Sequence, residues 1–149
     1  MTAWILTIML ALQPHAPWIE GYENTASIIA AKAQAAPMKG DKTGVYTAAI
    51  LVSLAWFESR FDPNAHNPKD PGGGSYGLYQ ASRVPVSDIG TQTEQALNAI
   101  KISFRACKTL PLDKRLSHYT TGGPVCFSTK ESTHRMNLAM KVLKEYPFP

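Results

Sequence analysis

The sequence predicts a single, mainly α-helical domain with at most a minimal β element. Its 149 residues suit one domain with a real hydrophobic core. A mostly apolar run without charges over residues 45–57 has the length of a helix rather than a strand, and two capping-box patterns later in the chain mark further helix starts. Neither an internal repeat nor an interdomain linker divides the sequence, so we predict one domain over residues 1–149.

The first third of the chain predicts two helices and a polar loop. Residues 3–12 form the first helix, which ends before Pro14, and Pro17 can begin a second one over residues 18–35. Apolar residues recur in the second helix at three- or four-residue spacing: Trp18, Tyr22, Ala26, Ile29 and Ala33. Residues 37–44 are expected to form a loop.

The apolar run within the first helix also has the length of a signal-peptide core. However, no Lys or Arg precedes it, since the first is Lys32, and Pro14 and Pro17 interrupt the region where a cleavage site would lie. We therefore expect a folded helix rather than a signal peptide, with the signal as the alternative. The run is too short to span a membrane, and no stable membrane insertion is expected.

The rest of the chain predicts mostly helices and one long polar loop. The central helix runs from about Thr43 to Arg60, and the only extended piece is expected at residues 75–81. Capping boxes at 91–94 and 128–131 open two further helices, the first reaching about Thr109. A short helix is predicted between them, over residues 112–119. The last helix places four apolar residues on one face: Met136, Ala139, Met140 and Leu143.

Glu58 is the first carboxylate after the apolar run of the central helix, which Asp62-Pro63 then ends. A helix that is apolar all round belongs inside a domain, so this acid is expected at the edge of the core. Burial removes its water, and the negative end of the helix dipole repels its charge. Both effects raise the pKa of Glu58, as a general acid working near neutral pH requires.

Three blocks of residues carry a family resemblance. They are the segment that begins Glu58-Ser59, then Gly77-Leu78-Tyr79-Gln80, then Tyr119 with Gly122-Gly123. In this order they resemble the soluble lytic transglycosylases, relatives of the goose-type lysozymes, which show Glu-Ser-x-Phe-x-Pro-x-Ala, Gly-Leu-Met-Gln and Tyr-Asn-x-Gly. The resemblance covers roughly residues 45–125 and is looser in the third block, where Thr120 replaces Asn.

This resemblance implies a lysozyme-like helical fold and cleavage of the MurNAc–GlcNAc β-1,4 bond of peptidoglycan, with Glu58 as the single acid and base and 1,6-anhydroMurNAc as product. It also implies roles in substrate binding. Ser59 would bond the muramic acid, Gln80 would bond sugar, and the hydroxyl of Tyr119 would lie near the acid. Tyr79 either stacks on a sugar ring or is a core tyrosine. Ser75, Tyr76 and Gly77 are expected to complete the substrate site, with Gly77 allowing close approach of the backbone.

Asp70 leaves a second mechanism open. The segment from Asp70 to Gly77 loosely resembles the aspartate-bearing stretch of goose-type lysozymes, in which an aspartate places the hydrolytic water. Ser82 stands where those lysozymes carry another aspartate, and this difference favours the transglycosylase. The alternatives are a hydrolysing lysozyme that uses Asp70, and an inactive glycan-binding or particle-assembly module.

The net charge of +4 and the pI of about 9.1 suit an anionic polymer such as the bacterial wall. The basic residues are scattered, so nucleic-acid binding is not expected. The four histidines lack metal-ligand spacing, and we expect neither a metal nor a cofactor. Action outside the cytoplasm is expected, and a phage particle or a secretion machine would suit such an enzyme.

The sequence contains two cysteines, which are either free thiols or a disulfide. Cys107 is expected on the inner face of a helix, and Cys126 lies in a Gly-Pro loop. Two buried free thiols are one interpretation. The other is a disulfide that forms in an oxidising compartment and fixes the loop bearing Tyr119.

Overall fold

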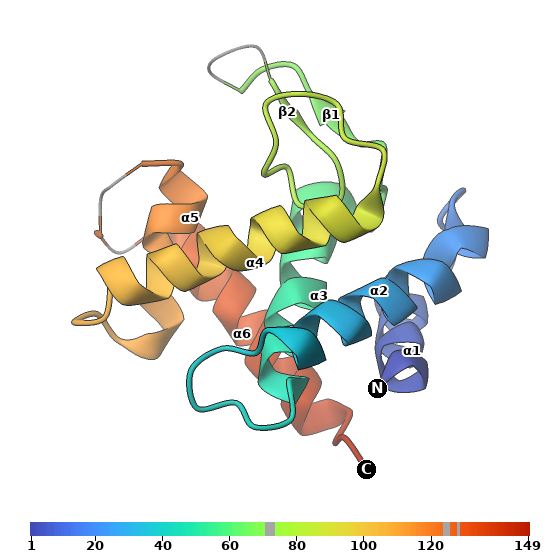
Figure 1. Cartoon of the computed structure of the whole chain (residues 1–149), viewed down its shortest axis with the longest axis horizontal. Coiled ribbons are helices and arrows are strands. Elements are labelled where there is room, and N and C mark those ends of the chain that lie inside the picture. Colours follow the sequence, from blue (N-terminus) through green and yellow to red (C-terminus); the bar gives the residue numbers. More distant parts are fainter. Residues whose placement is uncertain (71–73, 124–125, 128) are drawn as a thin grey trace.

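A computed structural model describes residues 1–70, 74–123, 126, 127 and 129–149 of the chain. The helical elements are α1 (Thr2–Leu12), η1 (Ile19–Gly21), α2 (Tyr22–Ala35), α3 (Val45–Ser59), α4 (Ile89–Ala106), η2 (Leu112–Lys114), α5 (Ser117–Thr121) and α6 (Lys130–Glu145), of which η1 and η2 are 3-10 turns (Figure 1). Two short strands, β1 (His66–Asn67) and β2 (Ser75–Tyr76), pair antiparallel with His66 opposite Tyr76. The prediction of a mainly α fold with a minimal β element is confirmed.

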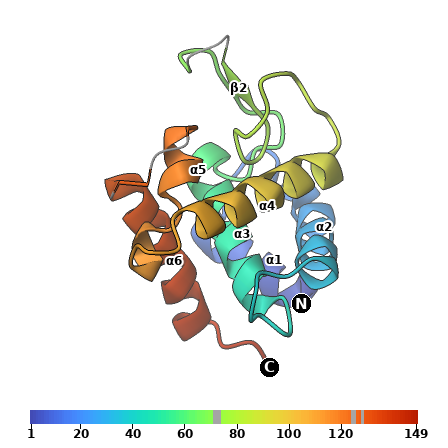
Figure 2. The same ribbon diagram turned by 60° about the vertical axis from the view of Figure 1, so that its left-hand side comes forward.

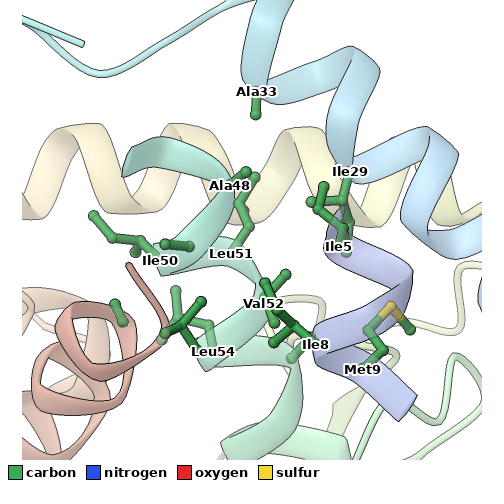
Figure 3. Close-up of a cluster of buried hydrophobic side chains, with 14 of the residues drawn as sticks. Ile5, Ile8, Met9, Ile29, Ala33, Ala48, Ile50, Leu51, Val52 and Leu54 are labelled. Atoms are coloured by element: carbon green, nitrogen blue, oxygen red, sulfur yellow. The ribbon is translucent and has the colours of Figure 1, made fainter. Parts of the chain in front are cut away.

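Helix α3 is the centre of the fold. Every residue from Thr47 to Ala55 is buried, and α3 contacts α1, α2, α4 and α6. Figure 3 shows how side chains of α1 and α2, among them Ile8 and Ile29, meet those of α3, among them Val52. A helix without charges along this stretch has no face that prefers water, so other helices cover it on all sides. Full burial of one such aliphatic side chain contributes about 1.5–3 kcal/mol.

Both ends of α3 are fixed by local chemistry. At its start the Asp41 carboxylate accepts hydrogen bonds from the backbone N–H groups of Gly44 (2.9 Å) and Thr47 (2.8 Å). At its end Arg60 and Phe61 both have left-handed φ angles, 55° and 66°. Phe61 is thereby turned back into the core, where its ring meets that of Tyr22 edge-on. The chain therefore leaves α3 directly after Glu58 and Ser59, close to the predicted end.

The N-terminal prediction is partly confirmed. Residues 2–12 form α1, which packs into the core, as expected for a folded helix. The helix predicted over residues 18–35 is instead divided into η1 and α2, which meet at Gly21. Glycine is a poor helix former because it loses the most backbone freedom, which accounts for a break at this position.

The later helices differ from prediction at their ends. Helix α4 begins at Ile89, two residues before the expected capping box, because the Asp88 carboxylate accepts the Thr91 N–H at 2.6 Å and is the true N-cap. The short helix predicted at 112–119 is divided into η2 and α5. In α6 the N-cap is Thr129, and Ser128 of the predicted capping box lies outside the described residues. Met140 is exposed rather than buried, and Val142 takes the inner position.

The hairpin of β1 and β2 stands at the Glu58 end of α3, on the same side of the molecule as α5 (Figures 1 and 2). The two chain termini lie together at the far end, where the Trp4 indole donates to the Tyr146 carbonyl at 2.6 Å. Among the described residues, no helix has both the length and the apolar character that crossing a bilayer requires.

Candidate active site

A cleft of about 900 Å³ lies between the hairpin, the end of α3, and helices α4, α5 and α6. Its walls come from five parts of the chain that are far apart in sequence. The lining residues are Phe57, Glu58, Asn67, Asp70, Tyr79, Gln80, Ala81, Arg83, Ala99, Ile102, His118, Tyr119, Thr120, Thr121, Gly122 and Arg135. A volume of this size can hold several rings of a polymeric ligand.

Glu58 lies in the wall of this cleft with 17% of its side chain exposed. Burial raises the pKa of Glu58 above its ordinary value, the nearby charge of Asp70 adds to this rise, and the Arg135 guanidinium acts against it. The net direction is the one predicted for an acid at the end of a buried helix. The carboxyl group is therefore more easily protonated than a surface glutamate, as proton donation to a substrate requires.

Arg135, which no sequence pattern indicated, is the direct partner of Glu58. Its Nε and Nη2 atoms each lie 2.8 Å from the same carboxylate oxygen, Oε1. The arginine comes from α6, which packs along α3, and its side chain is 13% exposed. Arg135 lies 77 positions after Glu58, so no local sequence motif contains both residues.

Asp70 shares the cleft with Glu58, so the two acids that the sequence singled out do lie together. The carboxylate of Asp70 accepts a hydrogen bond from the Asn67 amide at 2.8 Å and one from the Ser75 hydroxyl. Ser75 also lies 2.8 Å from Oε1 of Gln80. These contacts hold Asp70 and Gln80 in place at the rim of the cleft.

Gln80 lines the cleft, as expected for a sugar-binding residue, but its amide nitrogen is already engaged. It donates to the carbonyl oxygens of Gly77 (2.8 Å) and Ala65 (3.1 Å). Ser75 is buried and lies outside the cleft lining, so its predicted contact with substrate stays a prediction. Both residues shape the hairpin that forms one wall.

Three other predicted substrate contacts lie outside the cleft lining. The Ser59 hydroxyl lies 2.8 Å from the Leu78 carbonyl, to which it donates, and so ties α3 to the segment after β2. Tyr76 stacks on His66, with ring centroids 4.2 Å apart. Gly77 has a φ of 84°, and a Cβ there would lie 2.6 Å from the buried Gln92 amide. The positive φ and the close Gln92 side chain account for a glycine at position 77 without a ligand.

Tyr79 and Tyr119 are joined by a hydrogen bond between their polar atoms. The Tyr79 side chain is buried, with 2% of the residue exposed, so its ring is a core element and not a stacking surface for sugar. Its carbonyl oxygen accepts the hydroxyl of Tyr119 at 2.8 Å. Tyr119 lines the cleft near Glu58, and burial followed by the Glu58 charge raises the pKa of this tyrosine. Its hydroxyl therefore links two walls rather than binding the acid directly.

A disulfide joins Cys107, at the end of α4, to Cys126, with a Cα–Cα distance of 5.3 Å. The bridged interpretation of the two cysteines is thus the one the structure supports. The bridge encloses η2 and α5, and α5 carries His118, Tyr119 and Thr121 into the cleft. A covalent bond therefore closes the chain segment that carries one wall of the cleft.

No protein-family model, curated protein or solved structure matches this chain. Within the part of the chain that the structure describes, no three His, Cys, Asp or Glu side chains gather as a metal site would require.

Proposed function

We propose that the chain is a peptidoglycan lytic transglycosylase that cleaves the MurNAc–GlcNAc β-1,4 bond with Glu58 as its general acid and base. The observation that carries the proposal is a mostly buried glutamate of raised pKa in the wall of a cleft of about 900 Å³. Glycoside cleavage needs a proton delivered to the bridging oxygen, and a desolvated carboxyl group is suited to donate it. The Glu58-Ser59 and Gly77–Gln80 blocks add the family resemblance.

In the proposed reaction the proton moves from Glu58 to the glycosidic oxygen, and the C1–O bond breaks with its electron pair going to that oxygen. The 2-acetamido group of the substrate assists at C1. The 6-hydroxyl of the same muramic acid then attacks C1, and its proton returns to Glu58. The product is a 1,6-anhydroMurNAc end, no water is consumed, and the carboxyl group is restored.

A hydrolytic lysozyme is the second candidate, favoured by one observation. Asp70 lines the same cleft as Glu58, and its charge raises the pKa of Glu58. A second carboxylate so placed can orient a water molecule against C1. Hydrolysis leaves reducing ends, whereas transglycosylation leaves anhydro ends, so the products separate the two reactions.

The proposed site of action is outside the cytoplasm, on peptidoglycan strands. The Cys107–Cys126 disulfide supports this location because such bonds persist in oxidising compartments. The net charge of +4 favours an anionic wall polymer. A phage particle or a secretion machine would be a fitting carrier for a wall-opening enzyme of this size.

The deciding experiment is digestion of purified sacculi followed by mass spectrometry of the released muropeptides. The wild type is expected to release anhydro-muropeptides, and Glu58→Gln to lose activity by about a hundredfold or more. Glu94→Gln is the matched control, because Glu94 is an exposed glutamate paired with Lys32 on the surface. Retention of more than about a tenth of wild-type activity in Glu58→Gln would exclude Glu58 as the acid. An inactive wild type that still binds glycan would instead indicate a binding module.

A further inference from the structure

All three guanidinium nitrogens of Arg135 have a partner on the protein. Two of its nitrogens, Nε and Nη2, meet Oε1 of Glu58 at 2.8 Å, and its third nitrogen, Nη1, donates to the Glu131 carbonyl at 3.1 Å. Its Cζ atom lies 5.3 Å from the centre of the Phe57 ring, within the range of a cation–π contact. An arginine held in this way presents a rigid pair of donors rather than a mobile charge.

The backbone of the same residue is tied to the helix that carries the acid. The hydroxyl of Ser53, which is buried in the middle of α3, donates to the Arg135 carbonyl oxygen at 2.6 Å. Helices α3 and α6 are therefore joined twice at Arg135, once through its backbone and once through its side chain. These two contacts fix the position of α6 along the α3 axis, and this position places the guanidinium group beside Glu58.

The two contacts of the Glu58 carboxylate with Arg135 fall on one of its two oxygens. Both arginine donors meet Oε1, and no hydrogen bond from the described residues reaches Oε2. Hydrogen bonds from a charged donor are about twice as strong as neutral ones, so they define the orientation of the carboxyl plane. The second oxygen is left for a ligand in the cleft that Glu58 lines.

We propose that Arg135 is a positioning residue for Glu58, which holds Oε1 so that Oε2 faces the scissile bond and stabilises the carboxylate left after proton donation. This inference rests on the proposed function. In the first step the Oε2 proton moves to the glycosidic oxygen as the C1–O bond breaks, and the negative charge that forms on Glu58 faces Arg135. In the second step the 6-hydroxyl bonds to C1, and its proton returns to Oε2.

Other charged or titratable groups around Glu58 act beside Arg135. Asp70 on the hairpin works in the opposite direction, because its charge raises the pKa of Glu58. Tyr119 on α5 interacts with the Glu58 charge, and Arg83 and His118 line the same cleft. Among the described residues, Arg135 is the one of these groups that donates a hydrogen bond to the Glu58 carboxylate.

The test compares Arg135→Gln and Arg135→Lys with the wild type, and uses Arg105→Gln, an exposed arginine on α4, as control. The readouts are kcat, KM and the pH profile of anhydro-muropeptide release, together with a ¹³C NMR titration of the Glu58 carboxyl. For Arg135→Gln we expect kcat to fall about tenfold or more with little change in KM. We also expect the alkaline limb of the profile and the NMR pKa to move to higher pH, because the carboxylate loses its stabilising charge.

Arg135→Lys separates charge from geometry. Lysine keeps the positive charge but lacks the two-nitrogen fork, so the alkaline limb should stay near that of the wild type while kcat recovers only in part. This variant also decides the matter if Arg135→Gln fails to fold. Wild-type kcat and pH profiles in both variants would overturn the proposal, as would a loss confined to KM, which would make Arg135 a substrate-binding residue. Absence of anhydro products from the wild type would instead refute the proposed function, and the inference with it.

Discussion

The hydroxyl of Tyr119 donates a hydrogen bond to the carbonyl oxygen of Tyr79 at 2.8 Å. This bond joins α5 to the segment after β2, two walls of the cleft that are separated by 40 residues in the chain. Tyr119 also interacts with the Glu58 charge, which agrees with the position near the acid that the family resemblance implies.

Tyr119→Phe is expected to lower the free energy of unfolding by about 1 kcal/mol, because it removes one partly buried hydrogen bond. Glycan cleavage should fall by less than about tenfold, since Glu58 keeps its proton and its partner. Urea unfolding and muropeptide release measure the two effects. Tyr46→Phe is the control. The Tyr46 hydroxyl is buried without a hydrogen-bond partner in the described structure, so its removal should leave stability unchanged or higher.

Glu58→Gln should be more stable than the wild type at neutral pH. Burial raises the folded-state pKa of Glu58 above 4.5, its ordinary value, so the folded state binds the proton more tightly than the unfolded state. The wild type therefore loses stability as pH rises from this ordinary value through the folded-state pKa, whereas the glutamine variant does not. Thermal unfolding of both proteins between pH 3 and pH 8 checks this, and the difference should vanish at the acidic end. A variant less stable than the wild type at neutral pH would show that the Arg135 pair outweighs burial.

Asp70→Asn is expected to reduce cleavage by less than about tenfold, because a mechanism with one acid has no second base to lose. The substitution keeps the shape of the side chain and an oxygen that can accept from Asn67. Side-by-side digestion with Glu58→Gln gives the comparison. If Asp70→Asn is as inactive as Glu58→Gln and the wild type yields reducing ends, the hydrolase is the correct assignment.

Loss of the Cys107–Cys126 bridge should lower the free energy of unfolding by about 3 kcal/mol, the value expected for a loop of this length. Cleavage should also fall, because α5 lines the cleft inside that loop. Intact mass should differ by about 2 Da with and without reductant, which counts one bridge. The double variant Cys107→Ala/Cys126→Ala should be insensitive to reductant, and a reductant effect that persists there would have another origin.

Gly77→Ala should destabilise the fold by about 1–3 kcal/mol. A Cβ at this position would lie 2.6 Å from Gln92, whose amide cannot move easily because it bonds Leu78 N–H at 2.6 Å and the Val86 carbonyl at 2.5 Å. Gly21→Ala is the matched control, since nothing lies within 4 Å of its Cβ position and its φ is negative. Denaturant unfolding of the two variants should show a loss only in the first.

The features best predicted from the sequence are those set by neighbouring residues, such as an uncharged helical run and the residues that end it. The run that became α3 could be found because it has no charged residue to expose, and Asp62-Pro63 limits it from one side. The capping box predicts the N-cap of α4 at Thr91, three residues after the true cap, because the Asp88 carboxylate caps the helix instead. Strand β1 was missed because two exposed residues carry no alternating pattern.

The site was predictable only in part, because some of its residues are placed by tertiary packing rather than by a sequence motif. Glu58 and Asp70 were recognised as acids beside distinctive neighbours, and the structure brings both to one cleft. Arg135 looks like any charged residue on an amphipathic helix until the packing of α6 against α3 is known. Tyr79 shows that a position in the motif can be taken by a core residue, because its side chain is buried while its carbonyl oxygen accepts the Tyr119 hydroxyl.

The distance along the chain between Glu58 and Arg135, 77 positions, has a consequence for biosynthesis. A ribosome completes the acid and its helix long before it adds α6, and Cys126 likewise follows Glu58 by a long interval. A nascent or prematurely terminated polypeptide thus carries Glu58 without the arginine that contacts its carboxylate. Under the proposed function, such an incomplete chain would hold its catalytic acid without the positioning arginine, so we expect it to cleave glycan more slowly than the full chain.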